Sequence, residues 1–253
     1  MNTSADLVAE PVRRNVQRQD LEHTFILALI ALIWAAIIGG FAPEIVHHIR
    51  SHSRAYPYVV HFHGAAFCGW LMLLTTQSLL IGAGRRRLHM KLGIAGAMLA
   101  GTMVVLGPLT ALVTDRWHLG TPDSDPAFLI TQLTDIASFA GLALAGLLLN
   151  TNPGSHKRLM LLAALAITDA GFGRIVGTTL ETRFGEHAWS FFADGNGNDL
   201  LVIAIGVYDW LTQRRLYPAY VKGSAWILAW QVLAAWLYVT PAWKPIALRL
   251  IGS

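Results

Sequence analysis

Five residues within apolar stretches of the sequence have side chains that bind metals or exchange protons: His61, His63, Asp135, Asp169 and Asp199. Counted from the outer ends of the predicted membrane spans, they lie at similar depths. An ionisable group inside a bilayer costs on the order of several kcal/mol, so it needs a partner or a function. Imidazoles and carboxylates together bind Zn²⁺ or non-haem iron. The sequence therefore predicts a divalent metal site, with zinc or iron, in the outer leaflet.

Two further residues complete this hypothetical site. Arg174 is predicted to balance the carboxylate charge or to bind a substrate headgroup, and Asn198 to contact the substrate. Metal-bound water or dioxygen would then act on a lipid-like substrate. On a straight helix, His61 and His63 point about 200° apart, so both bind one ion only where the helix is irregular. The alternative is that each histidine hydrogen-bonds a buried carboxylate or carbonyl and holds helices together.

Two other functions remain open on the same sequence. His89 and His156 occupy equivalent places before two spans, and two facing imidazoles are the axial ligands of haem b. They would make the chain a haem- or quinone-binding redox or assembly subunit. Alternatively, Asp135, Asp169 and Asp209 act as relay carboxylates in a proton- or ion-coupled carrier.

The composition indicates a polytopic membrane protein. Hydrophobic residues make up 54% of the 253 residues and charged residues 13%, about half the share in soluble domains. The net charge is +4, but the cations cluster beside apolar runs, which indicates contact with lipid headgroups and not with nucleic acid. A single cysteine, Cys68, excludes an internal disulfide.

Apolar runs divide the chain into a polar cytoplasmic tail, residues 1–22, and one transmembrane domain, residues 23–253. The predicted fold is all-α with seven transmembrane helices. These are Thr24–Phe41, which stops at Pro43; the apolar run within Tyr58–Lys91; Leu92–Val113; Ala127–Leu149; Lys157–Leu180; Asp199–Thr212; and Ser224–Thr240. The segments Thr114–Pro126 and Glu181–Asn198 are predicted loops.

Orientation follows from the lysines and arginines in the short connections. With the N-terminus inside, every inner connection carries more of them than its outer neighbours, most clearly at Arg85–Arg87 with Lys91. The prediction is therefore an N-terminus inside and a C-terminus outside. A basic-Leu motif recurs before the third, fifth and seventh spans, which suggests one leading helix followed by three related hairpins.

Two segments of the chain resemble a known group of proteins. Trp70–Gly93, with its apolar helix and Gly-Arg-Arg-Arg-Leu-His, and Asn152–Leu161 resemble a widespread set of uncharacterised bacterial inner-membrane proteins. The resemblance covers about a quarter of the chain. It implies a place in the bacterial inner membrane and a loose relation to respiratory-chain assembly or b-type haem proteins, with membrane lipids as partners and a lipid-like molecule or a quinone as ligand.

Overall fold

A computed structural model describes residues 4–52, 54–122, 124–175 and 198–252, with side chains from residue 17 onward. All regular structure in these ranges is helical, which confirms the all-α prediction. The helices are α1 (Ser4–Arg50), α2 (Tyr58–Gly82), α3 (Arg86–His118), the short 3₁₀ helix η1 (Pro126–Phe128), α4 (Leu129–Leu148), α5 (Pro153–Leu165), α8 (Asp199–Gln213), α9 (Pro218–Val239) and α10 (Trp243–Ile251). Residues 169–175 are helical as well.

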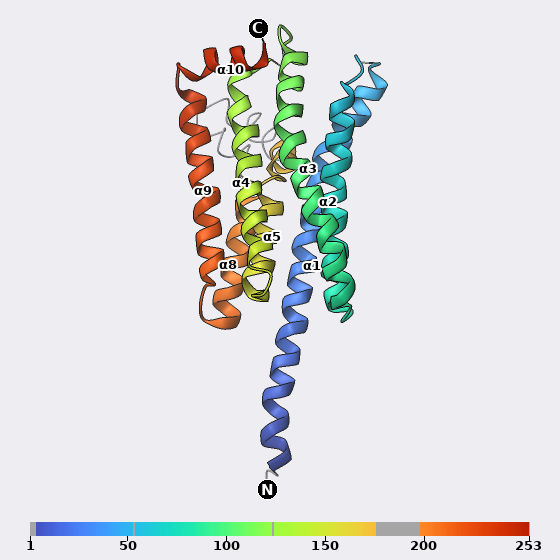
Figure 1. The fold of residues 1–253 in the computed structure, drawn as a ribbon, viewed down its shortest axis with the longest axis vertical. Helices are drawn as coiled ribbons and strands as arrows, with labels where there is room; N and C mark the ends of the chain where they lie inside the picture. The colour runs from blue at the N-terminus through green and yellow to red at the C-terminus, as the bar shows by residue number, and fades with distance from the viewer. Residues whose placement is uncertain (1–3, 53, 123, 176–197, 253) are drawn as a thin grey trace.

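The long helices lie side by side, and α1 projects from one end of the bundle, here named the N-terminal end (Figure 1). The turns that join α2 to α3, α4 to α5, and α8 to α9 also lie at this end. Each of these turns carries or precedes one copy of the basic-Leu motif. The opposite end is crossed by α10, which is bent by 94° from α9.

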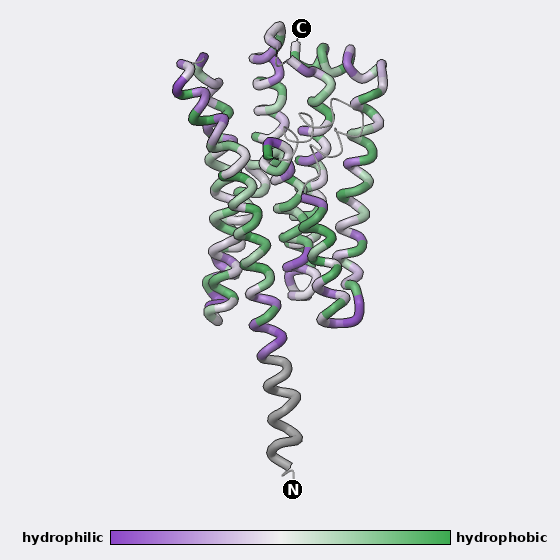
Figure 2. The backbone as a smooth tube through the Cα atoms, turned by 180° about the vertical axis from the view of Figure 1, so that it is seen from behind, coloured by the Kyte–Doolittle hydropathy of each residue, from purple (hydrophilic) through white to green (hydrophobic). Residues whose placement is uncertain are grey.

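Four helical segments are long and apolar enough to cross a membrane: Gln17–Arg50, Tyr58–Gly82, Arg86–His118 and Pro126–Leu148. The bent pair of α9 and α10 makes a fifth if it is counted as one span. Hydrophobic residues follow the middle of the helices, and hydrophilic residues gather toward their ends (Figure 2). Large apolar side chains such as Ile94 and Leu200 are exposed on the outside, as expected for helices surrounded by lipid.

The first helix differs from its prediction at both ends. It begins at Ser4, within the predicted polar tail, and it does not end at Pro43 but continues to Arg50. The third helix also exceeds its predicted span, because it starts at Arg86 and extends to His118 into the predicted loop. In both helices the polar ends remain helical beyond the apolar run, since charged residues such as Arg and Lys are good helix formers.

Tight packing joins the helices where small residues meet. A Cβ atom added to Gly40 of α1 would overlap with the carbonyl oxygen of Gly171, so the two backbones are in direct contact. Gly107 of α3 leaves room for the side chain of Ile136 in α4 in the same way. This agrees with the close helix approach that glycines allow in membrane proteins. These contacts fix residues 169–175 against α1 and α3 against α4.

Candidate functional site: a carboxyl pair at a broken helix

The fifth predicted span is interrupted in its middle. Helix α5 ends at Leu165, residues 166–168 form a turn, and a second helical piece begins at Asp169. Through the turn the backbone uses i→i−3 hydrogen bonds, including Thr168 N to Leu165 O at 3.1 Å and Gly171 N to Thr168 O at 3.1 Å. Such a change of hydrogen-bond pattern within a helix is typical of functional positions.

Asp169 begins the second piece of this helix and helps to restart it. Its Oδ1 accepts a hydrogen bond of 2.9 Å from the backbone N–H of Ala170. Carboxylates are favoured at helix N-termini because free N–H groups and the helix dipole point toward them. The Asp169 side chain is 7% exposed, so the break places a carboxyl group inside the bundle.

Asp135 of α4 meets Asp169 across the helix interface. The two carboxyl groups lie close enough to each other to share a hydrogen bond. A hydrogen bond between two carboxyl groups requires a proton on one of them, because an ionised carboxylate is an acceptor only. Within the described residues, no salt bridge reaches either side chain. We name these two residues the carboxyl pair.

The face of α4 that carries Asp135 is polar and turned into the protein. Thr131, Thr134 and Ser138 are 9%, 3% and 3% exposed. Thr134 bonds to the carbonyls of its own helix, whereas the hydroxyl oxygens of Thr131 and Ser138 have no hydrogen-bond partner. Residues at i−4 and i+3 share the face of residue i, so these two oxygens flank Asp135.

Asn198 closes the site from the start of α8. Its side chain is 1% exposed, and its Nδ2 donates to the carbonyl of Leu165 at 2.5 Å, directly at the helix break. The Oδ1 atom of the same amide is buried and has no hydrogen-bond partner. Asp199 lies close enough to act electrostatically on Asp169, and its own carboxylate accepts a hydrogen bond from Gln231 at 3.1 Å.

The two predicted histidine ligands do not join this group. His61 is exposed on α2, whereas His63 is half-buried and stacks on Phe67 with ring centroids 4.0 Å apart. Over the described ranges, no three His, Cys, Asp or Glu side chains come together as metal ligands. Of the five predicted ligands, the structure brings Asp135 and Asp169 into contact and places Asp199 nearby.

Arg174 also lies apart from the carboxyl pair. Its guanidinium donates to Glu44 of α1 at 2.6 Å and lies 4.1 Å above the ring centroid of Phe41. Asp169 and Arg174 therefore contact different partners on different helices. The cation thus balances a carboxylate on α1 instead of the pair.

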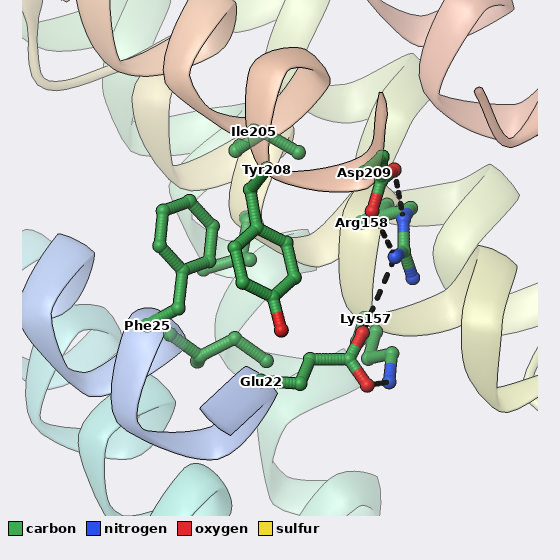
Figure 3. A pocket seen from close by; sticks show the side chains of 9 residues that line it. Glu22, Phe25, Lys157, Arg158, Ile205, Tyr208 and Asp209 are labelled. Carbon is green, nitrogen blue, oxygen red and sulfur yellow. Dashed lines mark hydrogen bonds and ion pairs between the residues drawn. The ribbon is translucent and has the colours of Figure 1, made fainter. Parts of the chain in front are cut away.

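A second buried ionic group, which we name the ion network, lies at the N-terminal end (Figure 3). Arg158 of α5 binds both carboxylate oxygens of Asp209 in α8, and these two side chains are 3% and 0% exposed. Glu22 of α1 accepts from Arg158 at 3.2 Å and also pairs with Lys157. The Arg158 guanidinium lies 3.6 Å above the ring centroid of Tyr217.

Sequence reasoning did not identify Arg158 or Glu22 as part of such a group. The available signal was Asp209 itself, because a carboxylate in an apolar helix requires a cation. The prediction that Asp209 is a relay carboxylate conflicts with this pairing, since both of its oxygens are occupied by Arg158.

The alternative pair, His89 and His156, does come together. The two rings are perpendicular, with centroids 6.1 Å apart. His156 Nδ1 lies 2.8 Å from the carbonyl of Gly146 and therefore donates to it, which leaves Nε2 free. His89 Nδ1 is buried without a partner, and its carbonyl accepts from Gln77 at 3.2 Å. His89 lies near the start of α3 and His156 near the start of α5, and the turns that precede these helices lie at the same end of the bundle (Figure 1).

Comparison of the chain with protein-family models, with curated proteins and with solved structures finds no match. The chemistry of the site therefore rests on its own residues. The carboxyl pair supplies two neighbouring carboxyl groups, and a break in the helix lies beside it.

Proposed function

We propose that the chain is an integral protein of the bacterial inner membrane with seven transmembrane helices, its N-terminus inside and its C-terminus outside, and that it acts as a proton-coupled carrier. In this proposal α5 and residues 169–175 form the fifth span, and α8 contributes the sixth. The turns with the basic-Leu motifs lie at the N-terminal end, which the positive-inside rule assigns to the cytoplasm.

One observation carries the function: the buried carboxyl group of Asp169 and the partly buried carboxyl group of Asp135 lie within hydrogen-bonding reach of each other at a helix break. Like charges in contact within a low-dielectric interior repel each other, so the pair holds a proton at rest. Discontinuous helices near the middle of a bilayer are the usual location of coupling-ion sites in secondary transporters. Asp135 and Asp169 are thus suited to bind and release one proton as the carrier changes conformation.

This function fits the geometry better than the metalloenzyme hypothesis does. A zinc or iron site needs at least three nitrogen, sulfur or oxygen ligands around one point. The carboxyl pair supplies two, His61 is exposed, and His63 packs on Phe67. Protonation requires no third ligand, because the second carboxylate stabilises the acidic hydrogen of the first.

Infrared spectroscopy of the purified protein tests the proposal. The wild type is expected to show a carbonyl stretch of a protonated carboxyl group at neutral pH, because the pair shares a proton. Asp135→Asn and Asp169→Asn should each remove this band. Asp20→Asn is the matched control, since Asp20 is exposed and its loss leaves the band unchanged. A wild-type spectrum without the band would overturn the proposal.

A second candidate function is favoured by the His89–His156 pair. Their centroid separation of 6.1 Å is close to the separation of two imidazoles that bind one haem iron, which is about 6 Å from metal–nitrogen bond lengths near 2 Å. The hydrogen bond from His156 to Gly146 also resembles the second-shell contact that orients axial histidines. A Soret band in the purified protein that is lost in His156→Ala would establish haem binding at this pair; a colourless wild-type protein would exclude haem b.

A further inference from the structure

The elements that carry the carboxyl pair also carry three buried oxygen atoms that have no hydrogen-bond partner. They are the hydroxyl oxygens of Thr131 and Ser138 and the Oδ1 of Asn198. All three side chains are more than nine-tenths buried. A buried polar atom without a partner costs about 1–3 kcal/mol, so three of them on the segments that carry the pair favour a bound ligand there.

The positions of these oxygens direct them toward the pair. Thr131 and Ser138 lie one turn before and one turn after Asp135 on the same helix face. The Asn198 amide is anchored by Nδ2 to Leu165 O at the break where Asp169 begins its helix. The free Oδ1 of that amide is therefore held beside the same break.

We propose that a sodium ion replaces the shared proton of Asp135 and Asp169 and is bound by the two carboxylates together with oxygens of Asn198, Thr131 and Ser138. This inference rests on the proposed proton function and names the second ion of the exchange. When sodium binds, the carboxyl O–H bond breaks, the proton leaves to water, and the ion takes its place between the carboxylates. One positive charge replaces another, so the net charge of the site does not change.

The ligand types favour an alkali ion. Carboxylate, amide and hydroxyl oxygens are hard ligands, which select hard cations and not zinc, copper or iron. Calcium sites combine more ligands, and several of these are carboxylates, whereas this pair supplies only two carboxylates in contact. A monovalent ion with the charge of a proton matches a site that is stable when it holds one proton.

Proton release measures the exchange directly. Purified full-length protein in detergent, in weakly buffered choline chloride with a pH indicator dye, is titrated with sodium chloride. The wild type should release about one proton per chain, because sodium and the proton compete for the same carboxylates. Potassium, calcium and further choline serve as comparison salts. Equal release by potassium or calcium would overturn the assignment of sodium.

Variants separate the ion ligands from the proton site. In Asn198→Ala and Ser138→Ala, the infrared band of the protonated carboxyl should persist while the sodium concentration for half-release rises by about tenfold, because one ligand is lost. Ser224→Ala is the matched control, since its hydroxyl is also buried without a partner but lies in α9 near the N-terminal end.

The two proposals fail in different ways. A wild type that shows the infrared band but releases no proton on sodium addition would overturn the sodium site alone. A wild type without the band would overturn the proton function, and the sodium exchange with it. If Asn198→Ala does not fold, Ser138→Ala decides, and an unchanged half-release concentration in that variant contradicts the proposed ligand set.

Discussion

The ion network and the carboxyl pair each contain buried ionisable side chains, Arg158 and Asp209 in the network and Asp169 in the pair, yet they are built in opposite ways. The network combines two acids, Glu22 and Asp209, with two bases, Lys157 and Arg158, and its charges cancel. The pair combines two acids in contact, and within the described residues no salt bridge reaches them. The nearest cation in sequence, Arg174, binds Glu44 instead.

This contrast distinguishes charged side chains that stabilise the fold from charged side chains whose state depends on a bound proton or cation. A neutral, fully hydrogen-bonded group holds helices together and gains nothing from a ligand. Two carboxyl groups in contact are stable only with a proton or a cation, so their state depends on what the surroundings supply. The network joins α1, α5 and α8 at the N-terminal end, whereas the pair lies beside the turn at residues 166–168.

The largest effect is expected from opening the ion network. Arg158→Met leaves Asp209 buried without a cation and should reduce the free energy of unfolding by about 3–5 kcal/mol. The double variant Arg158→Met with Asp209→Leu removes both charges and should recover most of the loss. Denaturant titration in detergent micelles, followed by tryptophan fluorescence, measures all three proteins.

Lys157→Met is the control for this series, because the Lys157 side chain is 32% exposed and, among the described residues, forms a salt bridge with Glu22 alone. It should cost no more than about 1 kcal/mol. A double variant that is as unstable as Arg158→Met would show that the network contributes more than charge cancellation, and the contrast with the carboxyl pair would lose its basis.

The second-largest loss of stability is expected when the helix contact that positions Asp169 is disturbed. Gly40→Ala places a methyl group where the carbonyl of Gly171 lies, so the helix piece that begins at Asp169 must move away from α1. Overpacking of this kind costs about 1–3 kcal/mol. Gly101→Ala is the matched control, since open space surrounds that position. Equal melting temperatures for the two variants would contradict the close contact.

The sequence predicted the helical class and most of the apolar segments, because a run of about twenty apolar residues is a local signal. It also placed Asp135 and Asp169 at similar depth. It did not predict the break at residues 166–168, since no proline or glycine marks it, and the hydrogen bond from Asn198 that occupies the Leu165 carbonyl comes from 33 residues away.

The sequence also did not predict which side chains meet across the bundle. Depth along a span follows from counting residues, but the facing direction depends on how each helix is rotated against its neighbours. His61 and His63 had the right depth and do not face the carboxyl pair. Arg158 and Asp209 are 51 residues apart and were never linked, although each needed the other.

A smaller effect is expected at the edge of the ion network. Glu22→Gln keeps a hydrogen-bond acceptor for Arg158 but removes its charge, and the Glu22 side chain is 19% exposed. We expect a loss of about 1 kcal/mol in the same unfolding assay. Because this pair is partly screened, high salt should reduce the difference between variant and wild type. A loss as large as that of Arg158→Met would place Glu22, and not Asp209, at the centre of the network.

The smallest effect on stability is expected at the carboxyl pair, together with the largest effect on function. In Asp135→Asn the amide N–H₂ replaces the shared proton as donor to Asp169, so the free energy of unfolding should change by no more than about 1 kcal/mol. The amide cannot release a proton, so the proton uptake that accompanies sodium efflux from sodium-loaded proteoliposomes, followed with an enclosed pH dye, should fall to the level of empty vesicles. Asp20→Asn should retain wild-type uptake. Two results together would contradict the distinction between the two regions: Asp135→Asn loses as much free energy of unfolding as Arg158→Met, and its proton uptake returns once added lipid restores the fold. The carboxyl pair would then hold the helices together in the same way as the ion network does.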